Sequence, residues 1–165
     1  MQRSFNWQEK IIQDNYYYND TNGYIGTNEL TVRIRKKKNK CYLQVKIPKL
    51  NEASLSIKEE REVEVTDIYQ KIPSDIIKQV IDNELGEVFQ IGKLTTKQKI
   101  CMIDSCEMAL DQKYYLGITD YELELECSGK VPSYIQQHLK EIGIGFDRCA
   151  FGKNKRFEIQ YNKKK

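Results

Sequence analysis

The sequence predicts an α+β protein built around an antiparallel β-barrel of about eight strands, with helices packed outside it. Three observations support this fold class. Apolar and polar residues alternate with a period of two in most segments, turn-forming residues separate several of these segments, and helical spacing is confined to short stretches. The chain of 165 residues is sufficient for a single domain, which we assign to residues 1–165.

The expected strands follow one another with short connections. They cover residues 15–18, 30–35, 41–47, 55–65, 94–103, 106–112, 120–126 and 155–161. The lysine-rich stretch at 36–40 is interpreted as a hairpin turn, and Pro48 as the end of the strand that follows it. Residues 1–12 carry apolar residues at a weakly helical spacing, which predicts a short helix or a docked tail.

Two segments have the apolar spacing of helices. The first begins after Pro73, covers about residues 74–84 and ends near Gly86. The second runs from Tyr134 to Ile142, with Ser133 as its N-cap and a glycine as its C-terminal stop.

Composition limits the classes of function. Hydrophobic residues make up 39% of the chain and charged residues 31%. This composition is polar for a small globular protein, but it lacks the low hydrophobicity and high net charge of a disordered one. The net charge of +3 is too small to indicate a specific nucleic-acid partner or a membrane surface. No apolar run approaches the roughly 20 residues of a membrane-spanning helix, and the N-terminus has no signal-peptide core. We therefore expect a soluble cytoplasmic protein.

The chain has five cysteines, an odd number, with no CxxC pair and only His138 as a histidine partner. This pattern argues against a disulfide framework and against a zinc site. Buried or half-buried free thiols in a reducing compartment are the expected state.

Charged residues recur on one face of the expected strands. In "DYELELE" at 120–126, Glu122 and Glu124 share one face, while the leucines share the other. Taken alone, this alternation indicates a hydrated face over an ordinary core. Other strands alternate in the same way, with cations at Arg33, Arg35, Lys46, Lys97 and Arg156, and carboxylates at Glu60, Glu62, Glu64 and Asp111.

If these faces point inward, the barrel encloses a polar tunnel with a basic wall and an acidic wall. Guanidinium and ammonium groups bind the oxygens of a phosphate chain, and carboxylates bind hard divalent cations that polarise those oxygens. A sheet with ordinary hydrated faces remains the alternative.

Five segments in order resemble the CYTH superfamily. They are Asn15-Tyr16-Tyr17-Tyr18 with Asp20-Thr21, "LTVRIR" at 30–35, "YLQVK" at 42–46, "EEREVE" at 59–64 and "ALDQKYYLGITDYELELE" at 109–126. Members of this superfamily include triphosphate tunnel metalloenzymes, thiamine triphosphatases and class IV adenylate cyclases. The chain looks most like small bacterial members that are often labelled adenylate cyclases.

The resemblance implies a closed antiparallel β-tunnel that binds a triphosphate and uses Mg²⁺ or Mn²⁺. It implies catalytic roles for Arg35 and Lys46. It implies substrate binding by these two residues together with Arg33, Lys97, Lys153 and Arg156, and metal binding by Asp111, Glu122 and Glu124, with Glu60 and Glu62 as further members of the acidic wall.

The chain departs from the family pattern in three places. The N-terminal strand with an E-x-E-x-K signature is missing, and an unpaired sheet edge in its place would favour a homodimer. Lys97 stands where the family tends to have arginine, and Asn19 replaces an aromatic residue.

Three functions follow from the resemblance. The first is metal-dependent hydrolysis of a short triphosphate, inorganic triphosphate or thiamine triphosphate. The second is an adenylate cyclase of the class IV type. The third is a truncated module that binds a nucleotide or polyphosphate without catalysis.

Overall fold

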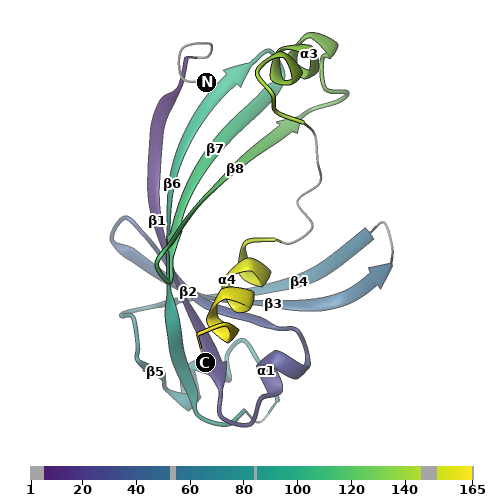
Figure 1. Ribbon diagram of the computed structural model, residues 1–165. Coiled ribbons are helices and arrows are strands. Elements are labelled where there is room, and N and C mark those ends of the chain that lie inside the picture. The colour runs from purple at the N-terminus through teal and green to yellow at the C-terminus, as the bar shows by residue number, and fades with distance from the viewer. Residues whose placement is uncertain (1–5, 53–54, 84, 146–151, 165) are drawn as a thin grey trace.

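The computed structural model describes residues 6–52, 55–83, 85–145 and 152–164. Eight antiparallel strands form one strongly curled sheet (Figure 1). The strands are β1 (Gln8–Asp20), β2 (Thr31–Lys37), β3 (Lys40–Glu52), β4 (Leu55–Val65), β5 (Lys71–Ile72), β6 (Val88–Ile103), β7 (Cys106–Tyr115) and β8 (Ile118–Cys127). Their order is β4-β3-β2-β1-β6-β7-β8, and β5 pairs with β6.

The sheet is barrel-like without being closed. Within the described ranges, β4 and β8 form its two ends and do not pair with each other. The fold class is therefore confirmed, whereas the expected closed tunnel is an open, curled sheet.

The first strand is longer than the sequence suggested. Residues 6–12 were expected in a helix or a tail, but β1 begins at Gln8, which pairs with Ile100 of β6, and Ile12 pairs with Lys97. The backbone hydrogen bonds of a strand in the middle of the sheet outweigh a weak helical spacing. Residues 1–5 of this prediction lie outside the described part of the chain.

The main apolar core lies on the side of the sheet opposite Arg33 and Arg35. Val32, Ile34, Leu43 and Val45 are fully buried there, under α1 (Tyr24–Thr27) and α2 (Ser74–Ile77). The helix expected over residues 74–84 is reduced to the short α2, because the chain turns after it and still buries Val80. The alternating strands thus leave their charged side chains on the other face.

The second expected helix is confirmed as α3 (Ser133–Glu141), although the N-cap is Pro132 rather than Ser133. Ile135 and Leu139 of α3 are buried in a cluster with Met108 of β7. Met108 is on the side of β7 opposite Asp111, so α3 lies outside the charged face, as expected.

Cys106 and Cys127 form a disulfide between β7 and β8. The expectation that all cysteines are free thiols is wrong for this pair, because the β7–β8 register places the two residues directly opposite each other. Cys41 and Cys101 are free and buried, as expected, and Cys149 lies outside the described residues.

Replacing Cys106 and Cys127 together by alanine is expected to lower the free energy of unfolding by about 3 kcal/mol. The bond joins residues 21 positions apart and therefore closes a loop in the unfolded chain, which reduces its conformational entropy. Urea unfolding with and without a reductant measures the effect. The reductant should destabilise the wild type and leave the double variant unchanged. An unfolding curve of the wild type that does not respond to the reductant would rule out the bond.

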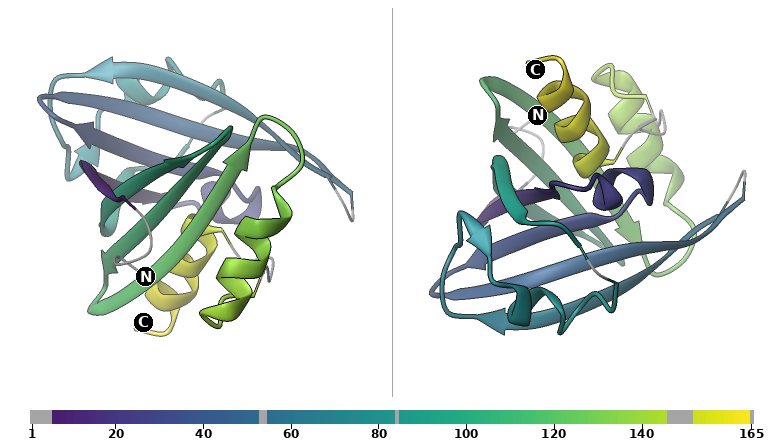
Figure 2. Two further views of the ribbon diagram at one scale, coloured as in Figure 1. Left: turned by 90° about the horizontal axis from the view of Figure 1, so that it is seen from above. Right: turned by 90° about the horizontal axis from the view of Figure 1, so that it is seen from below.

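The C-terminal segment forms a helix inside the curl of the sheet. A strand was expected at 155–161, but the structure has α4 (Lys153–Asn162), lying between the β3–β4 and β7–β8 arms (Figures 1 and 2). Phe157 is fully buried against Tyr17, with ring centroids 4.6 Å apart, and in the same cluster as Leu94 and Tyr115. Unlike α2 and α3, α4 is thus not packed outside the sheet.

Nowhere in the described ranges does a helix combine the length and the apolar character that crossing a membrane requires.

Candidate phosphate and metal site

Three strands at one end of the sheet form the basic wall. The register aligns Arg33 with Gln44 and Glu62, and Thr31 with Lys46 and Glu60. Because aligned residues of neighbouring strands share a face, Glu60 and Glu62 lie on the same side of the sheet as Arg33.

The cations of this wall are oriented by neighbouring side chains. The Nε atom of Arg33 donates a hydrogen bond to Gln44 Oε1 at 2.9 Å, and Arg35 Nε donates to Asn15 Oδ1 at 3.0 Å. Lys46 forms an ion pair with Glu60, and its hydrogen bond lowers the pKa of the Glu60 carboxyl. Burial, together with the nearby charge of Arg33, lowers the pKa of Arg35. The cost of holding two guanidinium groups side by side is relieved when an anion binds.

A polar cavity of about 470 Å³ opens beside this wall. Six cationic side chains line it: Arg33, Arg35, Lys46, Lys58, Lys153 and Lys155. Lys58 and Lys155 were not among the residues predicted for the site. The alternation of β4 places Lys58 on the face of Glu60, which was a usable signal for it, whereas Lys155 reaches the cavity only because its segment is helical.

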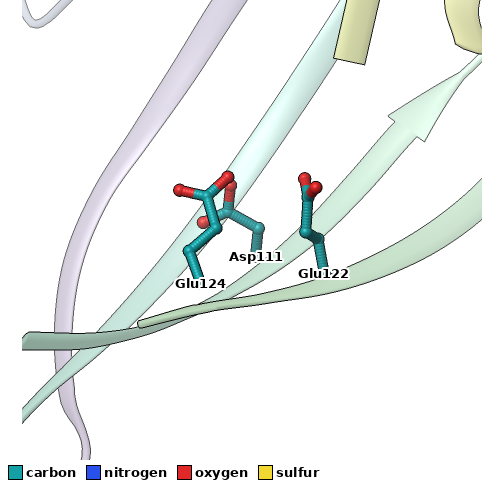
Figure 3. A group of neighbouring side chains, drawn as sticks. All are labelled: Asp111, Glu122 and Glu124. Atoms are coloured by element: carbon teal, nitrogen blue, oxygen red, sulfur yellow. The ribbon is translucent and has the colours of Figure 1, made fainter. Parts of the chain in front are cut away.

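Asp111, Glu122 and Glu124 form the acidic group on the other arm of the sheet (Figure 3). Asp111 of β7 is aligned with Glu122 of β8, and one oxygen from each of the three carboxylates lies within 4.8 Å of the others. Asp111 is fully buried and accepts a hydrogen bond from Gln98 Nε2 at 3.0 Å. Three convergent carboxylate oxygens are hard donors that fit Mg²⁺ or Mn²⁺.

Three cations contact this acidic group. Lys153 Nζ lies 2.7 Å from Asp111 Oδ2 and 3.0 Å from Glu124 Oε1. Arg156 Nη2 lies 2.8 Å from Glu122 Oε2, and Lys113 also forms an ion pair with Glu122.

The pKa values of Lys113 and Lys153 shift in opposite directions in this environment. Burial, with the charges of Lys153 and Arg156, lowers the pKa of Lys113 to about 8. Burial by itself would lower the pKa of Lys153 as well. The hydrogen bonds that Lys153 donates to Asp111 and Glu124 outweigh this effect, so the pKa of Lys153 is raised. The group is therefore densely paired, with its cations held close to the carboxylates.

Glu60 and Glu62 were predicted as metal ligands but lie apart from the acidic group, and Lys97 was predicted to bind substrate but does not line either cavity. Glu60 and Glu62 belong to β4, where they contact Lys46 and Gln44, and they are not part of the three-carboxylate group. Lys97 is on the opposite side of β6 from Thr96 and Gln98, with its Nζ 5.4 Å from the centre of the Tyr114 ring. The prediction that Lys97 lines the tunnel is wrong because the inward positions of β6 are the even ones at this point.

The basic and acidic parts meet at a small cavity of about 30 Å³ under the N-terminal end of α4. Arg33 and Arg35 line it from β2, Asp111 from β7, and Lys153 from α4. The residues predicted to bind phosphate and the candidate metal ligand Asp111 therefore line one small cavity.

Comparisons with known proteins identify the family and the fold of this chain. The chain matches the model of the CYTH domain family over residues 4–132. Proteins of this family bind triphosphate substrates and depend on a metal ion. A search of curated proteins found no significant match.

Similar solved structures share the fold. A candidate adenylyl cyclase from Hippeastrum, with a dominant triphosphatase activity, is 22% identical with a TM-score of 0.65, and the match covers 90% of this chain and 82% of the other. A candidate adenylate cyclase from Bacillus halodurans is 20% identical with a TM-score of 0.59, covering 89% and 82%. Because the family model covers most of its length, the chain belongs to the CYTH family.

Proposed function

We propose that this protein hydrolyses a short triphosphate, with Mg²⁺ or Mn²⁺ held by Asp111, Glu122 and Glu124. The observation that carries the proposal is the small cavity at which Arg33 and Arg35 meet Asp111. A phosphate chain bound by the arginines would place its oxygens beside the acidic group, where a divalent cation neutralises the charge between them.

The residues of the basic wall would act on the charge of the phosphate chain. Arg33 and Arg35 present guanidinium groups, which bind phosphate oxygens in pairs, and Lys46 presents a point charge from the neighbouring strand. We assign catalytic roles to Arg35 and Lys46, because both line the larger cavity and can stabilise charge that grows on the phosphoryl oxygens in the transition state. The metal ion, when bound, would polarise the same oxygens.

The lining of the larger cavity favours a compact substrate. Among the described residues that line it, none has an aromatic side chain, and the apolar contribution comes from small residues such as Gly26 and Pro48. A ring needs an apolar or aromatic surface on which to stack. Inorganic triphosphate is therefore our preferred substrate over thiamine triphosphate, and no observation favours an adenine ring and hence an adenylate cyclase.

A binding module without catalysis is the second candidate. It is favoured by one observation, namely that Lys153, Arg156 and Lys113 already pair with the carboxylates that would hold the metal. If these pairs persist with the anion bound, the protein would hold a triphosphate without turning it over.

The test is phosphate release from inorganic triphosphate, measured with Mg²⁺, with Mn²⁺ and with a chelator. We expect release with either ion and none with the chelator. ATP should be a poorer substrate and yield free phosphate rather than cyclic AMP. Calorimetric binding of triphosphate without release would favour the binding module, and cyclic AMP as the main product would favour the cyclase.

A further inference from the structure

The helix α4 presents its cations to the carboxylates that are proposed to hold the metal. Lys153 and Arg156 are three positions apart, so their side chains share one face of the helix. Lys153 contacts Asp111 and Glu124, while Arg156 contacts Glu122 and also Asp120, at 2.7 Å from Nη1. Each of the three candidate ligands is therefore paired with a cation of α4.

These pairs engage oxygens of the same three carboxylates that are proposed to hold the divalent cation. Asp111 Oδ2 accepts the hydrogen bond of Lys153, and Glu122 Oε2 is shared by Arg156 and Lys113. An ammonium group 2.7 Å from a carboxylate oxygen repels a dication and occupies its place. The carboxylates, in turn, need positive charge, because three of them converge and one, Asp111, is fully buried.

The same end of α4 also lines the phosphate cavity. Gly152, Lys153, Asn154 and Lys155 all contribute to its wall, and Lys153 lines the small cavity as well. Lys153 thus lies between the two halves of the site, within reach of a carboxylate on one side and of a bound anion on the other. Lys113 belongs to β7 and is fully buried, whereas Lys153 of α4 is partly exposed, so Lys153 is the cation best placed to turn from a carboxylate to a bound anion.

We infer that α4 is a built-in competitor of the divalent cation and that triphosphate relieves the competition. Without substrate, Lys153 and Arg156 neutralise Asp111, Glu122 and Glu124 and keep the affinity for the ion low. A bound triphosphate attracts Lys153 away from Asp111 and Glu124, which become available to the ion. Metal and substrate then bind with positive coupling. This inference rests on the proposed metal site, and it concerns how α4 controls that site.

The test measures binding of Mn²⁺ alone, from the electron paramagnetic resonance signal of the free ion. Lys153→Gln should bind Mn²⁺ about tenfold more tightly than the wild type, a typical coupling between linked sites. Phe157→Ala removes the side chain that anchors α4 and should tighten Mn²⁺ binding as well, without changing a charge. Lys163→Gln, at the exposed end of α4, is the matched control and should leave the affinity unchanged.

The outcomes separate this inference from the proposed function. Tighter Mn²⁺ binding by Lys153→Gln and Phe157→Ala supports the competition, whatever the rate of phosphate release. Equal affinity in the wild type and in both variants overturns the competition and leaves the metal site intact. Absence of Mn²⁺ binding in all four proteins overturns the metal site and, with it, this inference.

Discussion

Arg35→Ala is expected to lower kcat/KM for inorganic triphosphate by about 10²- to 10³-fold, the usual loss when one group that stabilises transition-state charge is removed. Arg35 lines both cavities and is held in place by Asn15, so its guanidinium is aimed before substrate arrives. Steady-state kinetics of phosphate release at saturating Mg²⁺ measures the loss. Because Arg35 is only partly buried, the variant should still fold, which circular dichroism can verify.

Lys97→Ala is the matched control for this experiment. Lys97 is a cation of the same sheet, on β6, but it contacts Tyr114 on the face of the sheet that points away from the cavities. Its removal should leave kcat/KM within about twofold of the wild type, since surface substitutions away from a site have small effects. If Lys97→Ala were as damaging as Arg35→Ala, the assignment of inward and outward faces on β6 would be wrong.

Asp111→Asn is expected to abolish measurable Mg²⁺-dependent turnover and to weaken Mn²⁺ binding by at least about tenfold. The substitution keeps the shape of the side chain, so Gln98 can still donate to Oδ1, but it removes the charge that a hard dication requires. It also takes one carboxylate from Lys153, which is partly exposed, so we expect a loss of stability of about 1 kcal/mol. Kinetics, Mn²⁺ titration and urea unfolding measure the three effects.

Glu126→Gln is the control for Asp111→Asn, because Glu126 is an exposed carboxylate of the same hairpin that lies outside the three-carboxylate group. It should preserve both Mn²⁺ binding and turnover. Normal turnover in a folded Asp111→Asn protein would contradict the role of Asp111 as a metal ligand.

The side-chain placements that the sequence predicted correctly are those on regular strands. Alternation alone placed Arg33 and Arg35 on one face of β2 and put Leu123 on the other face of β8 from Glu122, because successive side chains of a strand point to opposite sides. Asp111 and Glu122 then meet because they are aligned across a hairpin.

The other parts depend on information that alternation does not contain. The segment 155–161 alternates like a strand, yet it forms α4, because Phe157 and the cations of one helical face together fill the apolar and acidic parts of the concave surface. The face of Lys97 depended on the register of β6, which includes a shift relative to β1. Pairing of Cys106 with Cys127 required the register of β7 and β8, which a count of cysteines cannot supply.

The most direct test of the whole account is a crystal structure with Mn²⁺ and triphosphate, with anomalous scattering recorded for manganese. We expect a manganese peak about 2 Å from carboxylate oxygens of Asp111, Glu122 and Glu124. We also expect phosphate oxygens at Arg33 and Arg35, and Lys153 turned from Asp111 toward the triphosphate. A triphosphate bound elsewhere, or no manganese at the three carboxylates while Lys153 and Arg156 keep their present partners, would contradict it.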